Sequence, residues 1–268
     1  MVQSTRTGYP RPLRRHPAGV QQGSRMSKGN KGGGAGAGGG GAADQQQEGG
    51  GGWSDEEMRK AGINPLGMDP DDIDAIKKVG LTPKDLGDLA GKADAATITV
   101  SVSTFGKETT IYVNVNSPQL EGPSIRRIVV SPSGNKVIHN DFFAVKEQYQ
   151  GKGVAREMLR RQVESAQRLG ISSIRTNAVR AGTKFVGYYA WASLGYNAKL
   201  SADHISTLRS NAAAAGVAVP KNLGAVRDLH GLFKTPGGRE LWKKAGFSMD
   251  MTFDTRRGSM SNRMLNAK

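Results

Sequence analysis

The chain has 268 residues, a formal net charge of +15 and no cysteine. The lack of cysteine excludes disulfides, thiolate zinc sites and a cysteine nucleophile, and it fits an intracellular, cytoplasmic protein. No stretch contains the roughly 20 apolar residues that span a bilayer, and no apolar run near the N-terminus indicates a secretory signal.

The N-terminal part is basic and rich in glycine. Residues 1–31 contain seven Arg or Lys and no acid, and residues 32–52 have the sequence GGGAGAGGGGAADQQQEGGGG. Such a tract has too few apolar side chains to offset its backbone entropy, so we expect residues 1–53 to be a disordered arm. Its charge predicts non-specific contact with nucleic acid, although solubility and complementarity to an anionic cofactor explain the same charge. Met26 is an alternative start of the chain.

Short helices with strong capping signals follow over residues 54–92. SDEEMRKAG begins with Ser54 and three acids, DPDDIDAIKKVG places Asp69 before Pro70, and TPKDLGDLAG repeats the device from Thr82. Each start combines an N-cap residue with proline or acids in the first turn. A calcium loop is the alternative for DPDD, but the ligand spacing and the closing glutamate are missing.

From Ala95 onward, apolar and polar residues alternate, as in half-buried β-strands. The loops TFGKE, SPQLEGP and SPSGN interrupt the pattern, which predicts strands over residues 97–103, 111–116, 125–130 and 136–145. Because these loops are short, we expect the four strands to form an antiparallel meander.

The stretch YQGKGVAREML, residues 149–159, joins the fourth strand to an amphipathic helix that ends before Gly170. A strand, a glycine turn and a helix N-terminus together make an anion site, because the first N–H groups of the helix lack partners and glycine allows close approach. A purely structural connection, in which the glycines serve only the turn, is the alternative.

This stretch also matches the pattern Gln/Arg-x-x-Gly-x-Gly/Ala with Gln150, Gly153 and Ala155. It resembles the pyrophosphate-binding loop of the GNAT-type N-acetyltransferases, which hold acetyl-CoA there. The resemblance implies acetyl-CoA as co-substrate. It implies two groups of cofactor-binding residues: main-chain groups of Phe143 and Val145 for the pantetheine arm, and Gln150, Gly151, Lys152, Gly153, Val154 and Ala155 for the pyrophosphate.

The following elements extend the resemblance. A fifth strand, ISSIRTNAV, comes after the helix, and this order predicts a right-handed crossover between parallel strands four and five. AGTKFVGYYAWASLGY, residues 181–196, is similar to the next GNAT helix, and FSMDMTFD predicts a late antiparallel strand. The resemblance covers residues 95–200 well. It implies an α/β (α+β) fold over residues 93–268, with a GNAT-like mixed, mostly antiparallel sheet, flanking helices, and the cofactor where strands four and five splay apart.

The chain departs from the superfamily in two connections. Only TFGKE joins the first two strands, where the superfamily usually has two helices that build much of the acceptor site. In addition, residues 197–246 form an insert before the late strand. We expect three helices there: one from Ser201 to Gly216, one following Asn222, and one starting at Thr235 and Pro236. We hypothesise that this insert selects the acceptor.

The catalytic acid and base are less well defined. GNAT enzymes often carry a tyrosine, which protonates the leaving thiolate, at the position that is Trp191 here, so Tyr188 and Tyr189 are the candidates. Packing aromatics are the alternative for both. For the base we expect Asp141, because alternation puts it on one face with His139 and Phe143.

Other polar residues are weaker candidates for a site. Glu147 also flanks the fourth strand, and a surface position is the alternative for that residue and for Asp141. We expect His204 and His230, in the insert, to be helix-surface residues. The four histidines are far apart in the sequence, which predicts no metal site.

The leading hypothesis is an N-acetyltransferase in which an amine attacks acetyl-CoA directly. The acceptor stays open among small amines, a protein N-terminus, lysine side chains and aminoglycosides. The alternative is a catalytically inactive GNAT-like binding or structural module of a larger phage or nucleic-acid-associated assembly, which would be virion-associated if of phage origin. The missing acceptor helices and displaced tyrosine favour the module, and the intact loop favours the enzyme.

Overall fold

The computed structural model describes residues 53–91, 95–181 and 185–267. The chain divides into two compact units, Met1–Glu48 and Gly49–Lys268, and all described residues belong to the second. The predicted arm therefore lies outside the described residues except for Trp53, and the expected domain boundary at residues 92 and 93 falls in a gap. Among the residues described, no helix combines the length and apolar character that a membrane crossing requires.

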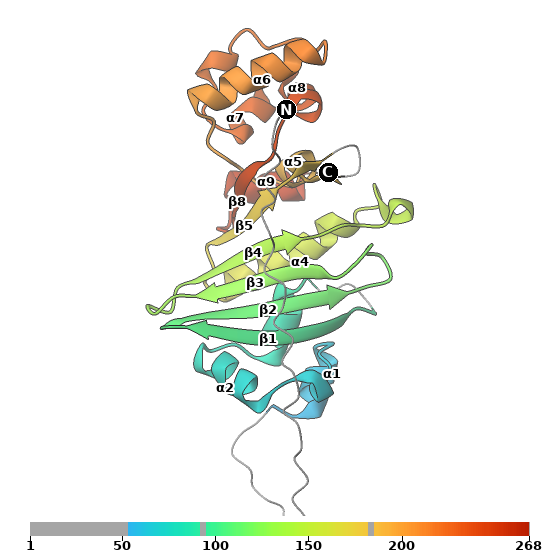
Figure 1. The fold of residues 1–268 in the computed structure, drawn as a ribbon, viewed down its shortest axis with the longest axis vertical. Coiled ribbons are helices and arrows are strands. Elements are labelled where there is room, and N and C mark those ends of the chain that lie inside the picture. The colour runs from blue at the N-terminus through green and yellow to red at the C-terminus, as the bar shows by residue number, and fades with distance from the viewer. Residues whose placement is uncertain (1–52, 92–94, 182–184, 268) are drawn as a thin grey trace, which may run out of the picture. The chain divides into compact units, whose positions relative to one another are not determined.

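A six-stranded sheet in the order β1-β2-β3-β4-β5-β8 organises the second unit (Figure 1). Neighbouring strands are antiparallel except for β4 and β5, which are parallel. This confirms the predicted mixed, mostly antiparallel sheet. Its strands are β1 (Thr97–Phe105), β2 (Glu108–Asn116), β3 (Ser124–Val130), β4 (Lys136–Phe142), β5 (Ser173–Ala178) and β8 (Met249–Asp254).

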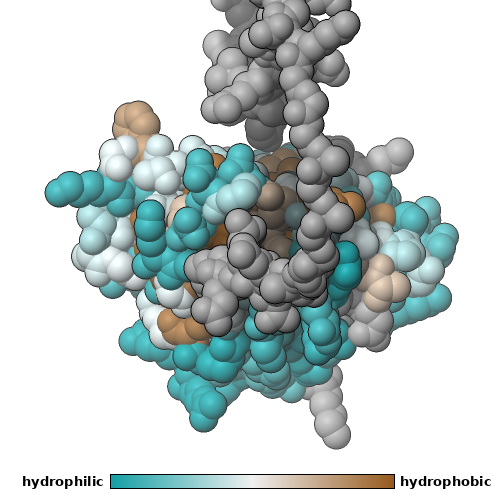
Figure 2. All heavy atoms as spheres, turned by 90° about the horizontal axis from the view of Figure 1, so that it is seen from below, coloured by the Kyte–Doolittle hydropathy of each residue, from teal (hydrophilic) through white to brown (hydrophobic). Residues whose placement is uncertain are grey.

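Three short helices precede the sheet, as predicted: α1 (Asp55–Lys60), α2 (Pro70–Lys78) and α3 (Pro83–Leu89), with the single turn η1 (Pro65–Gly67) between the first two. The side chains of Ser54, Asp69 and Thr82 cap them by accepting backbone N–H bonds. The helices bury apolar residues such as Ile76 and Leu86 in the common core. Viewed from their end of the unit, the surface not covered by grey atoms is largely hydrophilic (Figure 2).

Helix α4 (Val154–Arg168) lies against one face of the sheet (Figure 1). Its buried residues Met158, Leu159 and Val163 recur at helical spacing, as the amphipathic pattern predicts. The helix ends at Gly170, whose φ of 69° is left-handed, and the N–H of Ile171 donates to the carbonyl of Ala166 at 2.8 Å.

The helix expected over residues 181–196 is shorter than predicted. Helix α5 runs only over Gly187–Ser193, because β6 (Arg180–Ala181) and β7 (Phe185–Val186) pair as a small hairpin before it. The chain ends in α9 (Met260–Asn266), an element that the sequence did not indicate.

The insert is helical, but two of its three predicted starts are wrong. Helix α6 (Ala202–Ala214) begins after Ser201 as expected. Asn222 instead precedes the single turn η3 (Leu223–Ala225), and α7 (Leu229–Lys234) starts after Asp228, whose carboxylate accepts from the Gly231 N–H at 2.7 Å. Helix α8 (Gly238–Ala245) starts after Gly237, which adopts a left-handed φ of 77°, so Thr235 and Pro236 precede the helix.

Candidate functional site

Strands β4 and β5 pair over only three positions and then separate. Ile138 to Asn140 lie opposite Ile174 to Thr176, whereas β4 continues to Phe142 and β5 to Ala178 without pairing with each other. Thr176 closes the paired part by donating its hydroxyl to the Asn140 carbonyl at 2.8 Å. Beyond this point the two strands have unpaired edges that face one another. The sheet thus splays where the resemblance predicts.

A bulge in β4 contradicts the predicted alternation. Arg126 lies opposite Asn140, but the next residue of β3, Ile125, lies opposite Phe142, so Asp141 is an extra residue. Phe143 consequently leaves the face of His139. Its ring lies 5.8 Å from that of Trp191, on the side of the sheet where the core is buried.

The chain beyond the bulge is extended but is no longer a regular strand, although the prediction continued it to Val145. Its outer edge pairs with the loop before β3: the Glu121 N–H donates to the Ala144 carbonyl and the Lys146 N–H to the Gln119 carbonyl, both at 3.0 Å. Because successive residues of an extended chain direct their main-chain groups to opposite sides, those of Phe143 and Val145 face the gap beside β5.

The gap-facing main-chain groups are mostly free. The Val145 carbonyl accepts from the Gln150 side-chain amide at 3.0 Å, which braces the following loop against the strand. The N–H groups of Phe143 and Val145 have no partner within the described part of the chain. They are donors available to a ligand placed between β4 and β5.

The loop after β4 ends at a free helix N-terminus. After the turn η2 (Glu147–Tyr149), Gly151 and Gly153 have φ values of 72° and 82°, and a Cβ on either would meet nothing within 4 Å. The first bond of α4 runs from Glu157 N–H to the Gly153 carbonyl at 2.9 Å. The N–H groups of residues 154, 155 and 156 have no partner among the residues described, so an anion in the adjoining open space could accept from them.

A model of the acetyltransferase (GNAT) family matches residues 121–196. This segment is similar to the GNAT-type acetyltransferases. The match runs from the loop before β3 to Tyr196, three residues after α5, and so contains the splay, the bulge and the loop at Gly153. It confirms the resemblance drawn from Gln150, Gly153 and Ala155.

Comparisons with curated proteins and with solved structures give less support for a family than this match does. No curated protein matches the chain. Among solved structures, the crystal structure of nourseothricin acetyltransferase matches at 13% identity, over 66% of this chain and 96% of that chain, with a TM-score of 0.25. A TM-score of this size carries no argument about the present chain.

The predicted cofactor residues lie together. The carboxyl ends of parallel β4 and β5 meet at the same edge of the sheet, and Phe143, Val145 and the loop 150–155 all belong to that edge. Backbone donors beside two left-handed glycines suit a pyrophosphate, and the free groups of the extended segment suit an amide-containing arm. These residues therefore fit acetyl-CoA, the co-substrate of GNAT enzymes in general. The role of each residue stays a prediction.

The predicted acids face the insert. The Tyr188 side chain is buried, and its hydroxyl donates to the Lys243 carbonyl of α8 at 2.6 Å. Tyr189 is half-buried, with the Lys243 ammonium 6.0 Å from the centre of its ring. Trp191, at the position where the family often has tyrosine, contacts Phe143.

The predicted base is held in an ion pair. Both oxygens of Asp141 accept from Arg127, one of them from Nη2 at 2.9 Å. The hydrogen bond to Asp141 raises the pKa of Arg127. Half-buried His139 lies opposite Arg127, and burial, followed by the charge of Arg127, lowers its pKa. Glu147 lies in the exposed turn η2.

The insert histidines are partly buried and line a cavity of about 740 Å³ together with β8 and α9. Nδ1 of His204 accepts from the Ser201 N–H at 3.3 Å, and Nε2 of His230 lies 3.0 Å from the Gly195 carbonyl. Neither is the plain helix-surface residue that we expected. Among the residues described, no group of His, Asp and Glu could hold a metal ion.

Sequence reasoning missed a buried polar network behind the splay. The Asn140 amide accepts from Arg126 Nε at 3.2 Å and donates to the Gln162 side chain at 2.9 Å and to the Tyr196 hydroxyl at 3.0 Å. Burial lowers the pKa of Arg126 to about 10, and burial raises that of Tyr196. Alternation along β3 places Arg126 on the same face as buried Ile128, and this signal could have revealed the network.

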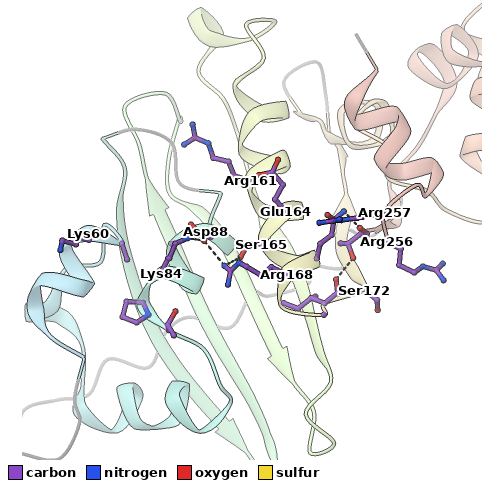
Figure 3. A pocket seen from close by; sticks show the side chains of 18 of the residues that line it. Lys60, Lys84, Asp88, Arg161, Glu164, Ser165, Arg168, Ser172, Arg256 and Arg257 are labelled. Atoms are coloured by element: carbon purple, nitrogen blue, oxygen red, sulfur yellow. Dashed lines mark hydrogen bonds and ion pairs between the residues drawn. The ribbon is translucent and has the colours of Figure 1, made fainter.

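A groove of about 1540 Å³ lies at the opposite end of α4 from the loop (Figure 3). Three of its cations have acidic partners: Arg168 pairs with Asp88 at 3.0 Å and Lys84 pairs with the same carboxylate at 2.6 Å, while Arg256 pairs with Asp254 at 2.7 Å. We assign this groove no ligand.

Proposed function

We propose that this chain is an N-acetyltransferase that uses acetyl-CoA and an amine acceptor. The observation that carries the proposal is the free main-chain edge of Phe143 and Val145 next to the free N-terminus of α4, within the segment that matches the GNAT family. The two features supply donors for an acyl-pantetheine arm and for a pyrophosphate along one side of the splay.

The chemistry needs few side chains. The bound co-substrate supplies a thioester; the amine nitrogen forms a bond to its carbonyl carbon, and the carbon–sulfur bond breaks. The N–H groups of Phe143 and Val145 can donate to the carbonyl oxygen as negative charge develops on it. The amine loses one proton and the thiolate gains one, so a base and an acid complete the balance.

The chain offers candidates for both proton transfers. His139 is favoured in its neutral form because burial lowers its pKa, which suits a base. Asp141 is the second candidate base, although Arg127 occupies both of its oxygens. Tyr189 and Tyr188 remain the candidate acids, and Tyr188 would first have to release the Lys243 carbonyl.

We also propose that the insert selects the acceptor. The cavity of about 740 Å³ between the insert and β8 includes Asp250, which accepts from the Asn177 side chain at 2.8 Å. Asn177 is the residue of β5 directly after Thr176, where pairing with β4 stops. The cavity therefore adjoins the splayed end of β5, on the face away from α4.

A binding module without turnover is the second candidate. It is supported by the engaged hydroxyl of Tyr188, by tryptophan at position 191, and by the ion pair that holds Asp141. In this case the chain would hold acyl-CoA but would lack a free acid and base.

Isothermal titration of the full chain with acetyl-CoA, followed by an assay of thiol release on an amine panel, separates these functions. Binding together with release on at least one amine supports the enzyme, and mass spectrometry of a treated lysate would then identify acetylated products. Binding without release on any amine or in the lysate supports the module. Failure of the folded protein to bind acetyl-CoA overturns both.

A further inference from the structure

The insert is a basic part of the described chain. Residues 197–246 contain eight Lys or Arg and three Asp or Glu, a net charge of +5. All eight cationic residues are exposed, and none forms an ion pair with another described residue. This differs from Lys84 and Arg168 in the groove at the far end of α4, which both pair with Asp88.

Four cations gather around α8, and we call them the α8 cation cluster: Arg180, Arg239, Lys243 and Lys244. Arg239 and Lys243 are four residues apart and so share a face of α8, separated by about 6 Å along its axis. Arg180, on β6, joins them by donating to the Lys244 carbonyl at 3.1 Å. Glu240 is the one acid in the sequence of α8.

Aromatic rings lie against three of these side chains, and Arg180 also donates to the Gly246 carbonyl. The guanidinium of Arg239 lies 5.0 Å from the ring centre of Phe233, and that of Arg180 lies 5.1 Å from Tyr188. The Lys243 ammonium lies 6.0 Å from Tyr189. A ring face attracts a cation without cancelling its charge, so it fixes the side chain and leaves the positive field available to a partner.

We propose that the α8 cation cluster binds the phosphodiester backbone of a nucleic acid. Fixed, uncompensated cations on one helix face attract a repeating anion without regard to base sequence. Arginine adds a planar donor set that matches phosphate oxygens. The inference does not rest on acetyl-CoA binding, because none of these side chains belongs to the free edge of β4 or to the loop before α4, although Arg180 and Lys243 lie against the candidate acids Tyr188 and Tyr189.

The test compares two triple variants of the full chain that lose equal charge. One is Arg239→Gln/Lys243→Gln/Lys244→Gln. The control is Lys78→Gln/Lys107→Gln/Lys136→Gln, on α2, the β1–β2 turn and β4. Binding of a fluorescent 20-nucleotide single-stranded DNA is followed by anisotropy between 0.05 and 0.2 M salt, together with the thermal midpoint and acetyl-CoA affinity of each protein.

We expect the cluster variant to bind the DNA about tenfold or more weakly at 0.1 M salt, with the slope of log K against log salt reduced by about 2, since each single-strand phosphate contact contributes about 0.7. The control should change much less. Equal losses in the two variants would assign the effect to net charge and overturn the proposal. Reduced acetyl-CoA affinity of the cluster variant, or equal competition by polyglutamate, would also overturn it.

Discussion

Gly151 and Gly153 flank Lys152 with left-handed backbone, and each has open space where a Cβ would be. The neighbouring Gln150 side chain is already bonded to the Val145 carbonyl. At the scale of single residues, the proposed site therefore depends mainly on backbone conformation and on main-chain donors. Side-chain charge has a secondary part, because Lys152 is exposed to solvent and to screening ions.

Substitutions in this loop should follow a defined order. Gly153→Val should nearly abolish acetyl-CoA binding, because valine is strained at a φ of 82° and its side chain enters the open space beside the α4 N–H groups. Lys152→Ala should cost on the order of 1 kcal/mol of binding free energy, as expected of an exposed charge contact. Gln150→Ala should fall between them. The measurement is the thermal shift induced by acetyl-CoA.

Gly170→Val is the matched control for this series. Gly170 also has a left-handed φ, of 69°, and open space around its Cβ position, but it lies at the other end of α4. The two valine variants should lose similar stability without ligand, and only the one at position 153 should lose the ligand-induced shift. A folded Gly153→Val protein that binds acetyl-CoA like the parent would remove the basis of the acyltransferase proposal.

The lowered pKa of His139 predicts how folding stability depends on pH. Burial and the charges of Arg127 and Arg175 lower its pKa, while Asp141 and Asp250 act in the opposite direction. Between the lowered value and the ordinary value of about 6.5, the unfolded chain binds more protons than the folded one. Stability should therefore rise with pH through this window and be lost as the pH falls through it.

The variant His139→Gln checks this prediction. Thermal midpoints of parent and variant are measured at pH 5, 6, 7 and 8, and the difference between pH 5 and pH 7 should be smaller in the variant. Identical pH profiles for the two proteins would show that His139 does not contribute to the dependence.

At the scale of elements, local signals predicted most of the fold. The capping residues of α1, α2, α3 and α6 and the alternation of the first three strands are encoded within a few neighbouring residues, and the structure confirms them. The loop before α4 was found in the same way, because its glycines and the helix that follows adjoin in sequence.

The wrong predictions concern residues whose structure depends on contacts with parts of the chain that are distant in sequence. The extra residue at Asp141 depends on how β4 pairs with β3, so the pattern of β4 alone could not reveal it. The Tyr188 hydroxyl donates to the carbonyl of Lys243 in α8, 55 residues later in the sequence. The start of α8 is set by Gly238, where a Cβ would lie 1.9 Å from the Leu232 carbonyl, so α7 and α8 approach too closely for another residue. Sequence spacing contains none of this information.

At the scale of the whole molecule, two of the segments with excess positive charge bear on nucleic-acid binding. Residues 1–31 carry seven cations without an acid, and the insert contributes a net +5. The buried apolar residues of the described part begin at Met58, in the unit that starts at Gly49. We propose that the N-terminal arm adds non-specific attraction to nucleic acid, separate from the α8 cation cluster.

Removal of residues 1–52 tests the arm directly. The truncated protein should keep its thermal midpoint and its acetyl-CoA affinity, because the core and the loop at Gly153 lie wholly outside the deleted residues. It should elute from a heparin column at lower salt than the full chain, since seven cations are lost with only two acids.

Truncation combined with the α8 triple variant should lower the elution salt further than either change alone, because the two charge groups would contact the polymer independently. Equal elution of full-length and truncated protein would count against any electrostatic role of the arm, and a combined effect no larger than truncation alone would leave the arm as the main contact.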